Sequence, residues 1–378
     1  MRNASVTIHL NNFLYNLSQI RRIVGPGVKI SAAVKANAYG HGALAIAQAA
    51  EKGGADFLGL ASPAEGIELR EGGIRAPILL YGISLPRDAQ SLTAHSVSAA
   101  VADEEGIAAF EKAAAGLGTK ARLHLKVDTG MGRIGCRPEA ALGLTRRIAA
   151  SPHLVLEGVF THFPSSDEAG LEYTRTQTEI FLSTVQAIRN AGINPGLVHA
   201  ANSGAILQHP STRFDMVRPG IILYGYYPSK EVPRPFPAKP VMELNAPVLF
   251  VKKVPAGTTI SYGRSWTAER ETWIATLGIG YADGYPRLLS NKGRVLMKGK
   301  TYPIVGRVSM DQTMVDLGTE TDVQRGDVAT LFGPDPAGPG AEEIAELTGT
   351  IPYEITCGIS LRVPRFAPGS QSPGRRGS

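Results

Sequence analysis

Over the first 225 residues, short apolar runs alternate with segments whose apolar positions recur every three to four residues. The second pattern predicts amphipathic helices, and the short runs rich in valine, isoleucine, leucine and alanine predict buried strands. Eight such runs are present, at residues 29–34, 56–61, 77–81, 97–101, 122–127, 154–160, 196–200 and 216–223. Eight strands alternating with helices predict a parallel (β/α)8 barrel, similar to a TIM barrel. We therefore expect residues 1–227 to form a barrel domain.

The pattern changes after residue 227. Residues 228–240 are rich in proline, which fits neither a helix nor a central strand and predicts a stiff linker. Beyond the linker, polar and apolar residues alternate in runs at 246–254, 258–262, 272–279, 293–297, 301–308, 313–317 and 328–332. Only residues 342–348 have a helical pattern. These runs predict a mostly antiparallel β domain at 241–368, followed by a disordered tail at 369–378.

Composition narrows the class of protein. An apolar content of 43% against 19% charged residues is typical of a soluble globular protein. The net charge of +6 comes from scattered basic residues, so we expect no nucleic-acid partner. There is no apolar signal segment and no run long enough to cross a membrane, so we expect a cytoplasmic protein with no membrane partner. Cys136 and Cys357 are too far apart in sequence to suggest a disulfide framework or zinc site, and we expect no metal.

Polar residues follow the predicted barrel strands, at the end where such barrels place their active sites. Lys35 follows the first strand, Lys126 and Arg133 the fifth, His162 the sixth and His199 the seventh, while Arg218 lies within the eighth. Burying a lysine at a strand end is costly unless its amine is used, for example by a covalent carbonyl partner. The segments Asn202-Ser203-Gly204 and Gly220-Ile221 could supply a hydroxyl and backbone N–H groups to a phosphate.

Each of these residues also has a purely structural interpretation. Lys35 and Arg133 could be solvated, His162 and His199 could be hydrogen-bonded core histidines, and Lys126 could pair with Asp128. Asn202-Ser203-Gly204 could be a helix cap, and Tyr262 could be a packing residue of a hairpin. From the residues alone we predict a barrel enzyme with a phosphate-bearing cofactor or substrate.

The segment Val-Lys-Ala-Asn-Ala-Tyr-Gly-His-Gly at residues 34–42 resembles the cofactor-lysine segment of alanine racemases. These two-domain enzymes carry pyridoxal 5′-phosphate on a lysine. The resemblance covers nearly the whole chain, and includes Ser261-Tyr262-Gly263-Arg264 and Met310-Asp311. It implies an isomerase that interconverts L-alanine and D-alanine for peptidoglycan by two-base proton transfer on a pyridoxal phosphate aldimine. It also implies a homodimer in which each active site is shared between chains.

The resemblance implies roles for the matching residues. Lys35 would carry the cofactor, and Lys35 and Tyr262 would be the two catalytic bases on opposite faces of the substrate. The other cofactor-binding residues would be Tyr39, His162, His199, Asn202, Ser203, Arg218, Gly220, Ile221 and Tyr353. The substrate-binding residues would be Arg133, Met310, Tyr281 and Lys126, the last being carbamylated in several family members. The chain departs from the pattern at His9, where an acidic residue is expected, and at Ser309, where many members have cysteine.

Other functions are compatible with parts of this pattern. A racemase of broader specificity, acting for example on serine, would share all of these residues. A non-enzymatic carrier of pyridoxal phosphate would share Lys35 but should lack Tyr262 and the β domain. A barrel decarboxylase of basic amino acids should have an acidic residue in place of Arg218, which as a permanently charged guanidinium cannot accept the ring proton. A carbamyl-lysine metallohydrolase should have His-x-His where this chain has Lys35-Ala36-Asn37.

Overall fold

The computed structural model describes residues 4–368. They form two compact units. The barrel unit comprises Leu14–Ala38 and Ile46–Ala238, and the β-rich unit comprises residues 4–13, 39–45 and 239–368. The predicted domain limits at 227 and 240 stay a prediction, and the predicted tail lies outside the described residues. No helix within residues 4–368 is both long enough and apolar enough to cross a membrane.

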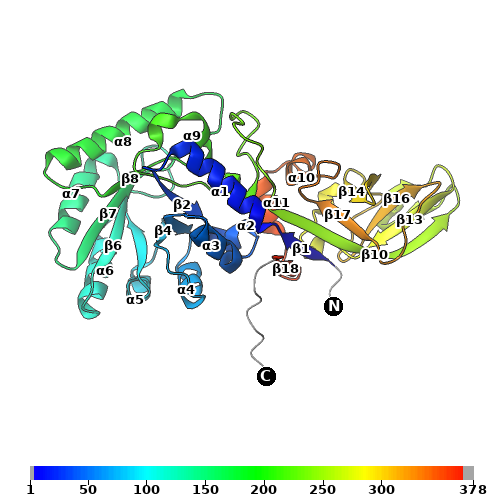
Figure 1. Ribbon diagram of the computed structural model, residues 1–378, viewed down its shortest axis with the longest axis horizontal. Helices are drawn as coiled ribbons and strands as arrows, with labels where there is room; N and C mark the ends of the chain where they lie inside the picture. Colours follow the sequence, from blue (N-terminus) through cyan, green and yellow to red (C-terminus); the bar gives the residue numbers. More distant parts are fainter. Residues whose placement is uncertain (1–3, 369–378) are drawn as a thin grey trace, which may run out of the picture. The chain divides into compact units, whose positions relative to one another are not determined.

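The barrel unit is built on a closed barrel of parallel strands, as predicted (Figure 1). Its strands are β2 Lys29–Ala33, β3 Phe57–Leu60, β4 Ile78–Ile83, β5 Val97–Val101, β6 Ala121–Lys126, β7 Leu154–Phe160, β8 Leu197–His199 and β9 Met216–Val217. The helices of this part of the chain are α1 Leu10–Val24, α3 Ala43–Lys52, α4 Pro63–Glu71, α5 Ala89–Ala94, α6 Glu104–Gly116, α7 Pro138–Ala149, α8 Glu172–Asn190 and α9 Ser203–Gln208. Phe57, Leu79 and Met216 come from three strands and form one buried apolar cluster. The apolar runs found in the sequence are therefore strands covered on both faces.

The predicted eighth strand, at 216–223, is wrong beyond its second residue. β9 ends at Val217, and residues Ile221–Tyr224 form a 3₁₀ helix. Pro219 has no N–H to continue a ladder, and Gly220 bends the chain with φ −117° and ψ −102°. All four residues of the 3₁₀ helix are buried. Because buried 3₁₀ residues are as apolar as those of a buried strand, the sequence pattern could not distinguish the two.

The β-rich unit contains an eight-stranded sheet with the order β15-β14-β17-β10-β1-β18, in which β13 pairs with β10 and β16. The strands are β1 Ser5–Ile8, β10 Met242–Val254, β13 Thr272–Leu277, β14 Arg294–Met297, β15 Lys300–Pro303, β16 Thr313–Gly318, β17 Val328–Phe332 and β18 Arg365–Phe366. A separate two-stranded sheet joins β11 Thr259–Ile260 to β12 Trp266–Thr267. Strand β1 pairs with β18 in parallel, and the other strand pairs among the described residues of this unit are antiparallel, as predicted.

Three parts of the β-rich unit differ from the sequence prediction. Strand β1, which lies outside the runs predicted as strands, pairs with β10 and so belongs to this sheet. Helix α11, Pro352–Gly358, was not predicted, and it follows α10, Ala341–Thr348, which was. The strand predicted at 258–262 ends at Ile260, because Ser261 turns the chain with φ 68°.

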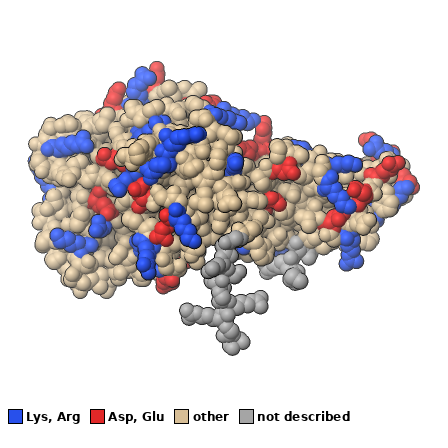
Figure 2. Space-filling model, viewed as in Figure 1, with Lys and Arg blue, Asp and Glu red and all other residues tan. Residues whose placement is uncertain are grey.

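Charged residues of both signs are interspersed on the face of the molecule shown in Figure 2. Blue lysine and arginine side chains lie next to red aspartate and glutamate side chains over most of this face. This face therefore presents no continuous basic surface of the kind that binds a nucleic-acid backbone.

Candidate active site

The chain forms one turn of left-handed helix directly after strand β2. The turn, α2, spans Lys35–Tyr39, and Ala36, Asn37, Ala38 and Tyr39 all have φ of 52° or 53°. For residues with a Cβ, this conformation costs roughly 1–2 kcal/mol each. Such strain persists only where the surrounding structure enforces it, and it concentrates at functional sites.

The carboxylate of Glu65 is one group that supports this turn. Its Oε1 accepts a 2.6 Å hydrogen bond from the backbone N–H of Ala36. Its Oε2 accepts from the N–H groups of Ala61 and Ser62, at 2.9 and 3.0 Å. Glu65 also completes the capping box of helix α4 with Ser62. One half-buried side chain therefore joins the loops that follow β2 and β3.

Replacing Glu65 with glutamine should destabilise the fold by about 1 kcal/mol, because one N–H donor would then face an amide nitrogen that cannot accept. The free energy of unfolding in urea measures this effect. Glu68→Gln is the matched control, since Glu68 is exposed on the same helix. Equal destabilisation by both substitutions would show that Glu65 does not support the turn.

Four basic side chains lie around His162, which follows strand β7. Burial is the main cause that lowers the pKa of His162 well below its ordinary value, and the charges of Lys126, Arg218, Arg133 and Lys35 lower it further. Lys126 ends strand β6, Arg133 follows it, and Arg218 and Lys35 follow β9 and β2. The structure thus brings five predicted site residues to one end of the barrel. His162 is therefore neutral at neutral pH.

Lys126 is buried at the end of β6, with only 3% of its surface exposed. Its Nζ lies 4.2 Å from the centroid of the Phe160 ring. Burial, followed by the charges of Arg218 and Arg133, holds the pKa of Lys126 well below its usual value, although Asp128 acts in the opposite direction. The Asp128 carboxylate instead accepts hydrogen bonds from the backbone N–H groups of Gly130 and Gly132.

Arg218 is buried among hydrogen-bond acceptors just after β9. Its Nη2 donates to the carbonyl oxygens of Thr161 and Ala200, at 2.7 and 2.8 Å. Its Nη1 lies 2.7 Å from Nδ1 of His199. Burial lowers the pKa of Arg218 to about 10, so the guanidinium remains charged at neutral pH.

The loops after β8 and β9 meet at Ser203. The N–H of Gly220 donates to Ser203 Oγ at 2.9 Å, which places Ser203, Gly220 and Ile221 together. A hydroxyl that accepts one hydrogen bond can still donate a hydrogen bond to an anion, so Ser203 Oγ remains available to a phosphate. The Asn202 side chain caps α9 by accepting from Ala205 N–H at 3.1 Å, as its structural interpretation predicts, and its cofactor-binding role stays a prediction.

The β-rich unit holds the other predicted site residues. Tyr262 and Met310 line a common hollow of about 600 Å³, and are 74% and 53% exposed. The loop with Tyr281 is tied to the Met310 loop, since Tyr281 N–H donates to Ser309 O at 3.0 Å. The rings of Tyr39 and Tyr353 lie 5.9 Å apart, centroid to centroid.

Several residues of these sites were missed in the sequence. The Ser62-x-x-Glu65 capping box was a visible signal. His124 and Glu157 lie in the apolar runs of β6 and β7, where a polar residue is unusual. Arg362, which bridges Asp283 and Asp311 at 3.4 and 2.8 Å, gave no local signal.

Comparisons with known proteins agree with this arrangement. The family model for the alanine racemase N-terminal domain matches residues 8–228, and that for the alanine racemase C-terminal domain matches residues 241–367. The alanine racemase of Treponema denticola is 46% identical over 374 residues, covering 97% of this chain and 98% of the relative. That of Chlorobaculum tepidum is 46% identical over 362 residues, covering 95% and 94%.

Solved structures give the same result. The alanine racemase of Clostridium difficile 630 superposes with a TM-score of 0.92 at 39% identity, covering 97% of this chain and 95% of that one. The Bartonella henselae enzyme, solved with covalently bound pyridoxal phosphate, gives 0.84 at 31% identity, covering 97% and 100%. The resemblance found in the sequence is confirmed, and the chain belongs to the alanine racemase family.

Proposed function

We propose that this chain is a pyridoxal phosphate-dependent isomerase that interconverts L-alanine and D-alanine, and so supplies D-alanine for peptidoglycan. The observation that carries the proposal is the cluster at the barrel end, where Lys35, Lys126, Arg133 and Arg218 lie around His162 and Arg218 Nη2 is 3.4 Å from His162 Nδ1. A site with this concentration of basic side chains attracts an anionic cofactor and the carboxylate of an amino acid.

The residues of this site fit pyridoxal phosphate. Lys35, at the end of an interior strand, would hold its aldehyde carbon covalently, and the buried charge of Arg218 would face the pyridine nitrogen. Ser203 and Gly220, which a hydrogen bond joins, and the adjacent Ile221 would bind the phosphate. From the family resemblance we also assign Tyr39 and Tyr353 to phosphate binding. When bound, the cofactor supplies the electron sink that makes the α-proton of an amino acid removable.

The protein itself supplies the proton transfers. Racemisation requires removal of the α-proton on one face and delivery of a proton on the other, which calls for two bases. We assign these roles to Lys35 Nζ and Tyr262 Oη. Arg133 and Met310 would bind the substrate carboxylate, Lys126 would support Arg133, and Tyr281 would line the entrance.

We further propose that the protein is a homodimer with shared active sites. Tyr262 and Met310 are both largely exposed within their own chain, and the hollow they line is open to another molecule. In a dimer, the β-rich unit of one chain would complete the barrel end of its partner. This arrangement would exclude water from the bases on both faces of the substrate.

Purified protein with added pyridoxal phosphate tests the proposal. We expect a visible absorbance band that remains with the protein on gel filtration, and conversion of either alanine enantiomer to the racemic mixture. L-serine, assayed in parallel, should react more slowly. A bound cofactor without turnover would favour a carrier protein, and faster turnover of serine would favour a racemase of broader specificity.

Arg362 should position the substrate loops. It joins Asp283, two residues after Tyr281, to Asp311, next to Met310. Its side chain is 40% exposed, so losing these ion pairs should change stability little. Arg362→Gln should therefore raise KM for alanine a few-fold with a smaller change in kcat. Arg325→Gln, an exposed arginine of the same unit, should change neither, and equal effects of the two would contradict this role.

A further inference from the structure

A chain of hydrogen bonds leads from Arg218 into the interior of the barrel. Arg218 Nη1 lies 2.7 Å from His199 Nδ1, and His199 Nε2 lies 2.9 Å from His124 Nδ1. His124 Nε2 in turn lies 3.1 Å from Glu157 Oε2. The members come from β6, β7, β8 and the segment after β9, so the chain spans neighbouring barrel strands. Both histidines are fully buried.

The chemistry of Arg218 fixes where each proton lies along this chain. A guanidinium has donors only, so Nδ1 of His199 must be unprotonated. Burial is the main cause that lowers the pKa of His199 and of His124, so each ring is neutral and carries one proton. His199 therefore has its proton on Nε2 and donates to His124 Nδ1. His124 in turn has its proton on Nε2 and donates to the Glu157 carboxylate.

Aromatic packing holds the two imidazoles in these orientations. The His199 ring stacks on Phe160, with centroids 4.7 Å apart and planes 4° from parallel. The His124 ring meets both Phe57 and Phe160 edge to face. Neither ring is exposed to water, so water cannot supply the hydrogen bonds that a different placement of the protons would require.

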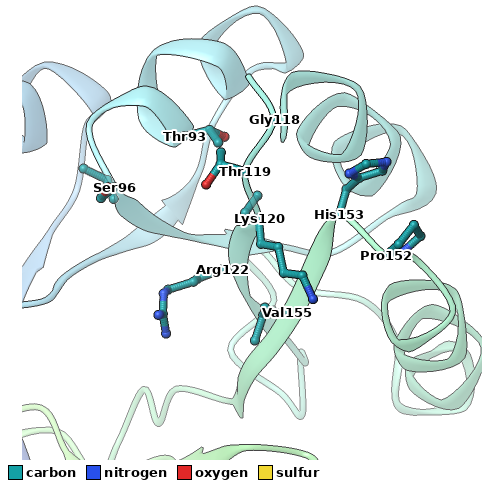
Figure 3. A pocket seen from close by; sticks show the side chains of 11 residues that line it. Thr93, Ser96, Gly118, Thr119, Lys120, Arg122, Pro152, His153 and Val155 are labelled. Carbon is teal, nitrogen blue, oxygen red and sulfur yellow. The ribbon is translucent and has the colours of Figure 1, made fainter. Parts of the chain in front are cut away.

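The far end of the chain is anchored near solvent. Glu157 also accepts hydrogen bonds from Ser98 Oγ and, at 3.1 Å, from Arg122. The Arg122 side chain is 64% exposed and lines a hollow of about 610 Å³ where β5, β6 and β7 begin. Figure 3 shows Arg122 among the residues that line this hollow, which include Lys120, Ser96 and His153. Glu157 lies in the middle of β7, and although burial raises its pKa, the hydrogen bonds from His124, Ser98 and Arg122 lower that pKa to about 2, so the carboxylate stays ionised.

We propose that Glu157 and His124 are positioning residues that hold His199 in the Nε2–H tautomer, so that His199 accepts from Arg218 and fixes the guanidinium. Without His124 Nδ1 as its acceptor, the Nε2–H tautomer of His199 would lose its advantage over the Nδ1–H tautomer. In the Nδ1–H tautomer, the N–H of His199 would face the N–H of Arg218. The guanidinium would lose one of its three short hydrogen bonds. This inference rests on the proposed function in one respect only, namely that Arg218 faces the cofactor ring.

Nitrogen NMR of cofactor-free protein labelled with ¹⁵N-histidine tests the proposal directly, because protonated and unprotonated ring nitrogens resonate far apart. His199 signals are assigned by their loss in His199→Gln. We expect unprotonated Nδ1 and protonated Nε2 in the wild type. In His124→Phe and in Glu157→Met, Nδ1 of His199 should gain a share of the proton. Glu157→Gln keeps an acceptor oxygen and should preserve the wild-type pattern, as should the exposed control Arg122→Gln.

Activity of the loaded enzyme provides a second measurement. His124→Phe and Glu157→Met should lower kcat for alanine about tenfold, by analogy with outer partners of metal ligands, while Glu157→Gln restores most of it. A protonated Nδ1 in the wild type, or His199 signals unchanged in both His124→Phe and Glu157→Met, would overturn the proposal. If the His199 signals change as expected but neither the wild type nor any variant racemises alanine, the proposed function fails while this inference stands.

Discussion

Replacing Lys35 with alanine is expected to lower kcat/KM for alanine by at least about a thousandfold, because one side chain would hold the cofactor and serve as a base. The visible absorbance of the protein-bound cofactor should disappear with it. The fold should survive, because β2 pairs with β3 only as far as Ala33 and Lys35 therefore lies beyond the paired part of the strand. Absorbance after gel filtration, alanine turnover and thermal unfolding are the measurements.

Lys29→Ala is the matched control for this substitution. Lys29 begins the same strand that Lys35 follows, and its side chain is 47% exposed and pairs with Asp56 at 3.7 Å. Such a surface pair contributes little to stability, so this variant should keep the cofactor and most of the activity. A Lys35→Ala protein that retains the absorbance band and can still be covalently trapped with borohydride would show that another residue holds the cofactor.

The barrel was predictable because its strands are buried on both faces and appear as uninterrupted apolar runs. Strands β5 and β7 were predicted to the residue, at 97–101 and 154–160. Errors arose where the backbone, and not the pattern of apolar residues, ends a strand. Gly220 does so after β9 and Ser261 does so after β11. In both places the apolar or aromatic residues continue beyond the last ladder hydrogen bond.

The candidate site was predictable in a different way. Its residues were found at strand ends, and their roles came from the family resemblance, so these roles stay predictions. The left-handed turn after Lys35 could not be predicted, because Ala-Asn-Ala-Tyr contains no glycine and its conformation depends on tertiary contacts such as that of Glu65. The series of hydrogen bonds from Arg218 to Glu157 includes one between His124 and His199, which are 75 positions apart in the sequence. No local sequence pattern reveals such a contact.

Co-expression of two inactive variants is expected to restore about a quarter of wild-type activity if the active sites are shared. The variants are Lys35→Ala, in the barrel unit, and Tyr262→Phe, in the β-rich unit. Random association makes about half of the dimers mixed. In each mixed dimer one site carries both substitutions, while the other takes Lys35 from one chain and Tyr262 from its partner and is intact. One good site in two, over half of the dimers, gives about a quarter.

The matched control places both substitutions in the same unit. In a mixed dimer of Lys35→Ala and Arg218→Ala, each barrel end carries one substitution whichever chain supplies Tyr262, so nothing should be restored. Differently tagged chains and two-step purification verify that mixed dimers form. If each site were built from a single chain, the Lys35→Ala and Tyr262→Phe pair would also stay inactive, because every site would keep one lesion. That result in verified mixed dimers would rule out shared sites, whereas recovery in the first pair alone requires Tyr262 to act on the barrel end of its partner.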